Sequence, residues 1–426
     1  MLFRSGLAPA LRASKPDVND ALKDGGSFIS ASYAQHRLRS ALVAAEFTLA
    51  FLLLIGSGLL IRSFVRLSNV APGFEPANVL TISTELANAK YSGNSQRQAF
   101  FSQLLDRVRT LPGVRAAAVT TRLPFSRFWG SASFLVEGQP EPPPGTSPMA
   151  LNQQVSADYF QTMRIPILAG RSFTASDLAP DSHSIIVSAA FAQRSLPAGA
   201  ALAKRVRLGA PTAPWSVVVG VVGDVRYTSL DAAPDPQVYL PYDGENANLA
   251  SVVIRTEQDP RGLASLVRTQ FAAIDPAQPV FDITTMTQRL DDSIETPRFN
   301  MALIAIFAAI ALALAMIGIY GVISYLVSQR THEIGIRVAL GAGRSDILWL
   351  VLGQGALMIL TGLALGVAGS LVLTRYLANL LYGVRPIDPL TMISVAALLI
   401  MVALAACYIP ARRALRLDPM TALRYE

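Results

Sequence analysis

The chain has 426 residues, of which 52% are hydrophobic and 15% are charged, and its formal net charge is +7. This composition is not that of an ordinary soluble protein and favours a membrane protein. The excess of positive charge does not indicate a nucleic-acid partner, because no basic stripe interleaved with aromatic residues occurs in the sequence. The single cysteine, Cys407, excludes a disulfide framework or a cysteine metal cluster within this sequence.

Residues 1–37 form a basic N-terminal segment without the apolar core of a cleavable signal peptide. The first apolar span is therefore expected to act as an uncleaved signal-anchor. Within this segment, "PALRASKPDVNDALK" (Pro9–Lys23) aligns without gaps with "PARRALRLDPMTALR" (Pro410–Arg424) near the other end of the chain. Either this similarity is chance in alanine-rich sequence, or residues 1–37 are the remnant of a preceding unit of the same kind.

Four apolar runs approach or exceed the roughly 20 residues that cross a bilayer core of about 30 Å. They cover residues 38–62, 300–327, 346–374 and 389–409. Four such lengths in one chain disfavour the buried core helices of a soluble protein. Glu46 is the one acidic residue inside the apolar part of these runs. It is expected either near the interface or in the helix bundle, where intramembrane carboxylates often mark function.

Lysine and arginine residues predict the orientation of the spans. They gather before the first span, between the second and third spans at Arg330, Arg337 and Arg344, and after the fourth span in residues 410–426. By the positive-inside rule these segments are cytoplasmic. We therefore expect a multi-pass protein with both termini in the cytoplasm and with residues 66–298 on the opposite side.

Residues 66–298, between the first and second spans, are numerous enough to form a domain. Runs rich in β-branched residues and bounded by turn residues predict strands at Asn78–Leu86, Arg115–Leu123, Ala132–Gly138, His183–Ser188, Trp215–Val225 and Ala250–Thr256. Two amphipathic helices are predicted between strands, with apolar faces of Phe100, Leu104, Leu105 and Val108, and of Leu263, Leu266, Val267 and Phe271. The predicted fold is a membrane protein with four transmembrane helices and a large α+β extracytoplasmic domain between the first two helices.

The sequence contains no pattern that predicts a catalytic or metal site. No GxxxxGK[ST] loop is present to cradle nucleotide phosphates, so ATP would have to be handled by another protein. His36, His183 and His332 are far apart in the chain, and neither HExxH nor CxxC occurs. No GxSxG is present, and only His183 could serve a catalytic triad in the extracytoplasmic domain. We therefore predict no catalytic residue and no metal ligand.

A short charged segment between the second and third spans is predicted to form a surface helix. Thr331 can cap its start, and Glu333 and Arg337 are spaced to form an i,i+4 pair. The glycines in "GAG" (Gly341–Gly343) end it. Such a helix lies along the cytoplasmic face of the membrane, either as a plain interfacial helix or as a docking surface for a partner.

The stretch "SQRTHEIGIRVALGAGRSDI" (Ser328–Ile347) resembles the segment after the second transmembrane helix of the FtsX/MacB-type ABC transporter permeases. In that family the segment has the pattern R-x-x-E-I-G-[IV]-R-x-A-L-G-A. The resemblance implies that this segment couples the permease to an ATPase. The implied coupling residues are Arg330, Glu333, Ile334, Gly335, Arg337, Ala339, Leu340 and Gly341.

Two further stretches carry the same resemblance. The tail "YIPARRALRLDPMTALRYE" (Tyr408–Glu426) is similar to the family's C-terminal ending, and "VSADYFQTMRIPILAGRSFTASD" (Val155–Asp177) is similar to part of its periplasmic domain. The resemblance implies a MacB-like periplasmic core domain at residues 66–298. It also implies an FtsX-like permease domain at residues 300–426, with a coupling helix at 331–341 and a cytoplasmic tail at 410–426.

The resemblance also implies partners. They are a cytoplasmic ABC ATPase, which would hold ATP and magnesium, and a second permease unit in a homodimer or pseudo-dimer. This chain itself is expected to bind no cofactor. Closure of the ATPases would move the spans and, through them, the periplasmic domain of a protein in the bacterial inner membrane. Membrane lipid is a further partner, the resemblance allows a periplasmic adaptor or outer-membrane channel, and no nucleic acid is expected.

Export or efflux of an unknown substrate is the first functional expectation. The alternative is a membrane-anchored regulator that activates a periplasmic cell-wall hydrolase, and the genes that neighbour this one would distinguish the two. A sensor is disfavoured because no kinase or DNA-binding segment follows the spans. The tandem permeases of Acidobacteria look most similar, and they carry two such units in one chain. We therefore expect either a fragment of a longer permease or a half that pairs with a partner.

Overall fold

The computed structural model describes residues 27–126, 130–143, 145–179, 182–196, 201–244, 248–329, 336–337, 343–377, 381–384 and 388–414. The chain divides into two compact units. One, called here the inserted domain, is Val65–Arg298. The other, the helical unit, comprises Met1–Phe64 and Phe299–Glu426. Pro9–Lys23 and residues 415–426, which carry most of the predicted terminal repeat, lie outside the described residues.

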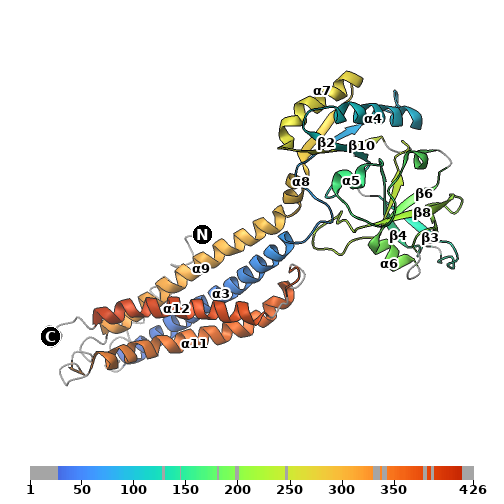
Figure 1. Ribbon diagram of the computed structural model, residues 1–426. Coiled ribbons are helices and arrows are strands. Elements are labelled where there is room, and N and C mark those ends of the chain that lie inside the picture. Colours follow the sequence, from blue (N-terminus) through green and yellow to red (C-terminus); the bar gives the residue numbers. More distant parts are fainter. Residues whose placement is uncertain are drawn as a thin grey trace. The chain divides into compact units, whose positions relative to one another are not determined.

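Four long helices make up the described part of the helical unit (Figure 1). They are α3 (Ser27–Ser68), α9 (Glu295–Gln329), α11 (Arg344–Leu377) and α12 (Pro389–Ala414). Each holds a stretch long and apolar enough to cross a membrane: Ser40–Ser68, Glu295–Gln329, Gly355–Tyr376 and Pro389–Pro410. The predicted fold class, four transmembrane helices with a large mixed domain between the first two, is confirmed.

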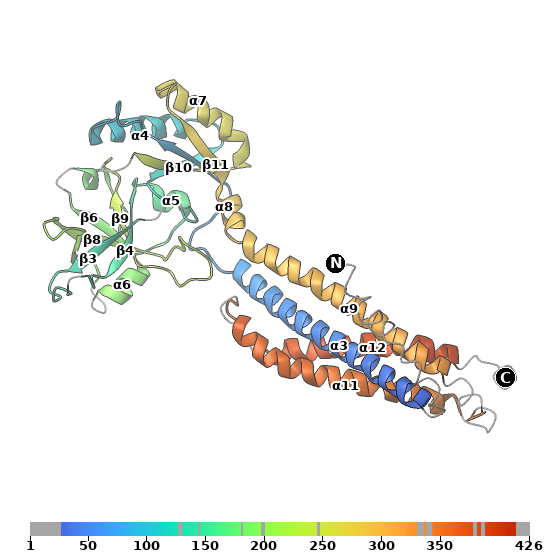
Figure 2. The same ribbon diagram turned by 180° about the vertical axis from the view of Figure 1, so that it is seen from behind.

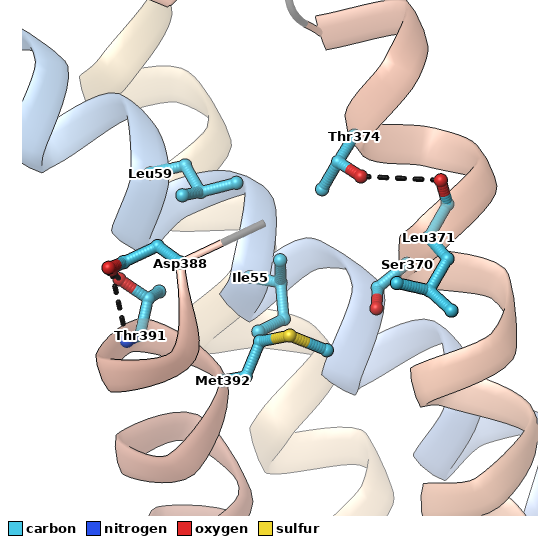
Figure 3. A pocket seen from close by; sticks show the side chains of 8 residues that line it. All are labelled: Ile55, Leu59, Ser370, Leu371, Thr374, Asp388, Thr391 and Met392. Atoms are coloured by element: carbon cyan, nitrogen blue, oxygen red, sulfur yellow. Dashed lines mark hydrogen bonds between the residues drawn. The ribbon is translucent and has the colours of Figure 1, made fainter. Parts of the chain in front are cut away.

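The four helices pack through one apolar core. Its buried members include Phe47, Phe51 and Ile55 of α3, together with Ile319 and Ile323 of α9. Leu399 and Ala403 of α12 are fully buried in the same cluster. Where α3 meets α11 and α12, the side chains around Ile55 and Leu59 close the space between the helices (Figure 3). A helix surface that is apolar on all sides is expected of membrane spans, because their outer faces meet lipid.

The inserted domain is built on eleven strands within the described residues. They are β1 (Val79–Glu85), β2 (Val114–Thr120), β3 (Ser131–Val136), β4 (Met149–Val155), β5 (Ile167–Gly170), β6 (Ser184–Ser188), β7 (Arg205–Leu208), β8 (Trp215–Val222), β9 (Gln237–Pro241), β10 (Leu249–Thr256) and β11 (Val280–Thr285). The strand order is β11-β1-β10-β2-β4-β3-β7-β8-β6-β9, with β5 beside β8 and a further pairing of β4 with β9. All six predicted strands are present, with ends that differ by a few residues, and five strands were not predicted.

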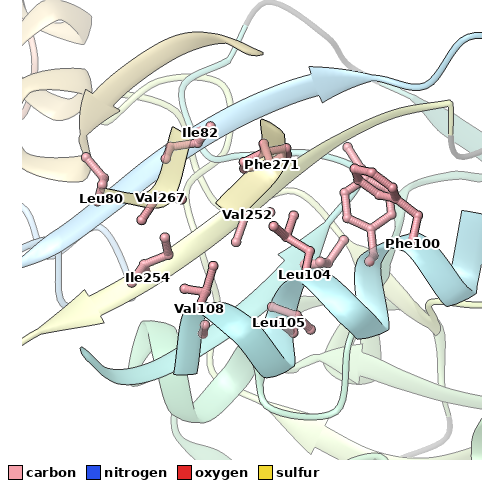
Figure 4. Close-up of a cluster of buried hydrophobic side chains, with 14 of the residues drawn as sticks. Leu80, Ile82, Phe100, Leu104, Leu105, Val108, Val252, Ile254, Val267 and Phe271 are labelled. Atoms are coloured by element: carbon pink, nitrogen blue, oxygen red, sulfur yellow. The ribbon is translucent and has the colours of Figure 1, made fainter. Parts of the chain in front are cut away.

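The first lobe of the domain is an antiparallel sheet of β11, β1, β10 and β2. Two helices, α4 (Asn94–Arg109) and α7 (Ala264–Ile274), cover one of its faces, and a short 3-10 helix η2 (Pro260–Leu263) leads into α7 (Figures 1 and 2). Figure 4 shows the core between helices and sheet. The predicted apolar face of α4 is confirmed, as Phe100, Leu104, Leu105 and Val108 are all buried.

One residue of the second predicted helix face is placed differently. Leu266 is 43% exposed, whereas Leu263, Val267 and Phe271 are buried. These three residues recur every four positions and form a single stripe against the sheet. Leu266 lies about 100° around the helix from Val267, so it falls outside that narrow stripe.

The second lobe is a closed barrel of six strands. The strands pair in the order β4, β3, β7, β8, β6 and β9. The ring is closed because β9 also pairs with β4, in parallel. Every strand of this ring places residues in one apolar cluster. They include Phe134, Ala150, Ile185, Val206, Val218 and Val238. The barrel interior is therefore filled by side chains, as expected for a ring of few strands.

Three short helices accompany the two lobes. They are α5 (Tyr159–Met163), α6 (Ala189–Ser195) and α8 (Met286–Ser293), and a 3-10 helix η1 (Ala175–Leu178) lies between β5 and β6. The motif of the predicted periplasmic domain, Val155–Asp177, covers the end of β4, α5, β5 and part of η1. Tyr159, Phe160 and Met163 of this motif are fully buried, so its aromatic residues serve the core of the domain.

Candidate functional site

Most of the predicted ATPase-coupling residues lie outside the described residues. Arg330, Glu333, Ile334, Gly335, Ala339, Leu340 and Gly341 lie outside the described residues. Arg337 is described, in helical conformation beside Ile336, whose side chain is 40% exposed. The coupling role of this set therefore stays a prediction. Its place in the chain is clear, because it joins the C-terminal end of α9 to the N-terminal end of α11.

A polar cluster fastens α3 to α12 at the C-terminal end of α3. Arg62 donates a hydrogen bond to the carboxylate of Asp388, and the hydroxyl of Thr391 donates to the same oxygen. The backbone N–H of Thr391 donates to it as well, at 3.1 Å (Figure 3). Asp388 thus caps α12, whose first residue is a proline, a usual N-terminal arrangement.

Two more contacts strengthen this junction. The backbone N–H of Tyr382 donates to Ser63 Oγ at 2.8 Å, so the segment before α12 is also bound to α3. A Cβ atom on Gly58 of α3 would lie 2.8 Å from Cγ2 of Thr391, which shows how closely the two helices approach. The side chains drawn in Figure 3 line a narrow space between α3, α11 and α12. The contacts named above fasten α3 to α12 beside this space.

Glycines of α11 form a second close contact, with α3. A Cβ atom on Gly362 would meet Cβ of Phe47 at 2.9 Å, and one on Gly366 would meet Cδ1 of Phe51 at 2.8 Å. Thr48 donates a hydrogen bond to the carbonyl of Gly362 at 3.1 Å. Gly362 and Gly366 are four residues apart and so follow the small-xxx-small pattern that lets membrane helices approach. The Gly-x-x-x-Gly spacing is visible in the sequence, but this helix contact was not predicted from it.

Glu46, the intramembrane acid, lies at the contact of α3 with α9. A Cβ atom on Gly318 of α9 would be 2.3 Å from its Oε2, so the glycine makes room for the carboxylate. Glu46 therefore lies beside the contact of α3 with α9, while the residue itself remains exposed. No described residue forms an ion pair with it.

The histidine that alone could have served a triad in the inserted domain is not arranged for catalysis. His183 precedes β6 and lies in a cavity wall with Ser182 and Ser184. The two serine hydroxyls face each other at 3.3 Å, and within the described residues no hydrogen bond joins either to the imidazole. A general base must lie within hydrogen-bond reach of its nucleophile. The described residues also hold no group of three metal-binding side chains.

A buried polar network, also missed from the sequence, holds the two lobes of the inserted domain together. The hydroxyl groups of Tyr159 and Tyr227 are 2.9 Å apart, and the Gln153 amide donates to Tyr227. Burial raises the pKa of Tyr227 to about 12, and burial also raises the pKa of Tyr159. Both phenols are therefore neutral at physiological pH and act as hydrogen-bonding groups of the core.

Two family models match the chain. The model of the MacB-like periplasmic core domain matches residues 47–278, and that of the FtsX-like permease C-terminal matches residues 305–419. Together they cover most of the inserted domain and most of the helical unit, in the order expected from the sequence.

The chain is also similar to curated proteins that carry the name MacB. The macrolide export ATP-binding/permease protein MacB of Agrobacterium fabrum is 30% identical over 285 residues, which are 63% of this chain and 42% of the relative. The MacB of Hahella chejuensis is 27% identical over 302 residues, 65% of this chain and 44% of the relative. The chain thus spans less than half the length of these relatives. The solved periplasmic region of MacB from Actinobacillus actinomycetemcomitans matches with a TM-score of 0.37 and 14% identity, over 54% of this chain and 98% of that one.

Proposed function

Because this chain belongs to the FtsX/MacB-type ABC transporter permeases, we propose that it is the membrane subunit of an ATP-driven transporter. In this proposal a separate cytoplasmic ATPase drives movement of the inserted domain on the other side of the bacterial inner membrane. The observation that carries it is the combination of four spans with a MacB-like core domain inserted after the first. The chain would export or expel its substrate without carrying it through a channel of its own.

The geometry of α9 supports mechanical coupling. This helix has 35 residues and is therefore about 50 Å long, more than the roughly 30 Å hydrocarbon core. Its N-terminal end follows the inserted domain, and its C-terminal end leads into the predicted coupling segment. A push on that segment would be passed along a single continuous helix. The apolar core that α9 shares with α3, α11 and α12 would make the other spans move with it.

The proposed partners follow from what the sequence lacks and what its relatives contain. The chain holds no glycine-rich phosphate loop, so ATP and magnesium are proposed to bind the partner ATPase. A second permease unit would complete the transporter, and both termini would be cytoplasmic. Membrane lipid would surround the exposed apolar faces of the spans, such as Ile306 and Ile317 of α9. A periplasmic adaptor or an outer-membrane channel would extend the export path of the substrate beyond the inner membrane.

Replacing both charges of the predicted coupling helix tests the proposal. Glu333→Ala together with Arg337→Ala should lower the stimulation of the cognate ATPase by at least about tenfold, the effect of losing about 1.4 kcal/mol of docking free energy. The measurement is the ATPase rate of the complex reconstituted in lipid vesicles, beside the rate of the ATPase alone. Membrane insertion of the variant should be unchanged.

The matched control removes the same two charges in the inserted domain. Arg115→Ala with Glu257→Ala breaks an ion pair whose side chains are 57% and 56% exposed. Such surface pairs contribute little stability, so this variant should stimulate the ATPase like the wild type. A coupling variant that stimulates as strongly as this control would contradict the proposed docking site.

A further inference from the structure

The six-stranded barrel of the inserted domain is closed at one end. Helix α6 follows β6 directly, and its Phe191 is fully buried in the barrel cluster. The ring of Phe191 lies 4.7 Å from that of Phe134 on β3, measured between centroids. Ser188 caps α6 by accepting from the N–H of Phe191 and also accepts from the N–H of Gln237 at the start of β9. This end of the barrel is therefore plugged by a helix that two strands hold in place.

The other end of the barrel opens into a cavity of about 710 Å³. All six barrel strands reach its wall, through Ala132, Asn152, Ser184, Leu208, Ser216 and Leu240. Five of these residues stand two positions from an interior residue of the same strand and so share its face: Ala132 with Phe134, Asn152 with Ala150, Leu208 with Val206, Ser216 with Val218, and Leu240 with Val238. The cavity is thus the mouth of the barrel, which we call the barrel mouth.

The side chains change character from the barrel interior to the barrel mouth. The interior positions are aliphatic or aromatic, whereas Asn152 and Ser216 at the mouth bear an amide and a hydroxyl. Mouths of barrels are common ligand sites, and their volumes usually lie between about 300 and 1,000 Å³. Polar groups that point into such a space without filling it provide hydrogen bonds for a guest.

Arg122 brings a positive charge to the rim of the barrel mouth. It follows β2 of the first lobe, and a turn in which Thr120 Oγ1 donates to the Arg122 carbonyl at 2.8 Å sets its direction. Its Nη1 donates to Asn152 Oδ1 at 3.3 Å. The guanidinium lies directly over Gly130, where a Cβ atom would be 1.7 Å from Nη1. No described carboxylate lies within ion-pair distance of it, although the side chain is half-buried.

The acidic residues at the barrel mouth already have partners. Asp177 of η1 accepts from both Nη atoms of Arg171 and from the backbone and hydroxyl of Thr174. Asp243 also takes part in interactions within the domain. Among the described residues that line the cavity, Arg122 is the only lysine or arginine. A half-buried guanidinium with spare donors beside an open polar cavity is suited to bind an anion.

We propose that the barrel mouth binds a small polar organic anion, with its carboxylate or phosphate on Arg122 and its hydroxyl or amide groups on Asn152 and Ser216. This inference deepens the proposed function, because it names the class of compound that the transporter would handle outside the membrane. Only the role of the bound compound as a transporter substrate rests on the proposed function. Binding itself requires no ATPase, so a failure of one proposal is distinguishable from a failure of the other.

Two matched pairs of probes test the proposal by isothermal titration calorimetry on the full chain in lipid nanodiscs. N-acetyl-alanine and glucose 1-phosphate carry an anionic group, whereas N-acetyl-alaninamide and glucose have the same bodies without it. At least one anionic probe should bind, and its neutral counterpart should bind about tenfold more weakly or less, as the loss of one charge-assisted hydrogen bond predicts. The probe that binds tells whether the site takes carboxylate or phosphate.

Variants locate the binding. Arg122→Gln should weaken the anionic probe by about tenfold or more and leave any binding of the neutral probe unchanged. Gly130→Ala should weaken it as well, because the new methyl group displaces the guanidinium. Arg115→Gln, at the opposite end of β2, removes the same charge far from the mouth and should bind like the wild type. Absence of binding by both anions, or equal binding by wild type and Arg122→Gln, would overturn the proposal.

Discussion

At the scale of single residues, Asp177 shows how a buried charge is stabilised in the inserted domain. Its side chain is 4% exposed and accepts hydrogen bonds from Arg171 and from Thr174. The hydrogen bonds from Arg171 hold the pKa of the Asp177 carboxyl well below its usual range, with a smaller contribution from Thr174. Because the folded-state pKa is depressed, this stabilisation is complete above the ordinary pKa of about 4 and is lost as the pH falls toward the folded-state value.

Asp177→Asn is therefore expected to lower the free energy of unfolding by about 2–3 kcal/mol at pH 7, the value of hydrogen bonds to a buried charge. The difference from the wild type should shrink as the pH is lowered below about 4. Urea unfolding followed by tryptophan fluorescence at several pH values measures it. Asp106→Asn is the control, because that side chain is 72% exposed. Equal losses in the two variants at pH 7 would contradict the assigned role.

Arg255 shows what sequence patterns cannot predict at this scale. It lies in β10, is 5% exposed and donates to the backbone carbonyls of Thr162, Ala77 and Glu75. These partners are 93, 178 and 180 residues away in the chain. Alternation along a strand gives the face of a residue but not its distant partners. The position of Arg122 beside the barrel mouth could not be predicted either, because its partner Asn152 lies on another strand, 30 residues away in the chain.

At the scale of elements, apolar patterns predicted the spans, the main helices and the most hydrophobic strands. The strands that were missed carry little of that signal. β4 reads "MALNQQV", and its polar residues Asn152 and Gln154 face the barrel mouth instead of the core. β5 and β7 have four residues each, which is too short for a periodic pattern to stand out. Of the six strands around the barrel mouth, β3, β6 and β8 were predicted, and β4, β7 and β9 were missed.

The contact of α3 with α11 yields a prediction about glycine. Gly366→Ala should lower the free energy of unfolding in detergent by about 1–3 kcal/mol, because the new Cβ overlaps Phe51 close to its backbone. The new methyl group of Gly353→Ala on the same helix meets no atom of the described residues within 4 Å. It should be neutral or stabilising by up to about 1 kcal/mol, as alanine favours helices over glycine. Thermal unfolding followed by circular dichroism compares the two. If both variants were as stable as the wild type, the close approach at Gly366 would be wrong.

At the scale of the whole molecule, the described residues form four apolar clusters, one in the helical unit and three in the inserted domain. The core of the helical unit uses residues from α3, α9, α11 and α12, and the three clusters of the inserted domain lie between Phe74 and Met286. Hydropathy along the sequence predicted the boundary between the helical unit and the inserted domain, because the helices are continuous apolar runs and the domain alternates apolar with polar residues. The closure of the barrel was not predictable, since it depends on the parallel pairing of β4 with β9 across more than eighty residues of chain.

The inserted domain is expected to fold when it is produced alone. Its first and last strands, β1 and β11, pair directly, with Leu80 opposite Thr285, so the two ends of the domain leave from neighbouring strands. Domains inserted into another chain commonly have termini close together, and such domains can fold independently. Residues 65–298 secreted to the periplasm should give a soluble protein with a single cooperative urea transition.

A shorter piece provides the comparison for this prediction. Residues 65–278 end where the MacB-like model ends and lack both β11 and Met286, which is fully buried in a domain core. Loss of β11 leaves one edge of β1 unpaired, and loss of Met286 leaves a cavity in an apolar cluster. The shorter piece should therefore unfold at a lower urea concentration than residues 65–298. An isolated domain that aggregates or shows no cooperative transition would mean that the helical unit is needed for its folding. In that case the two units could not move as the separate bodies that mechanical coupling requires.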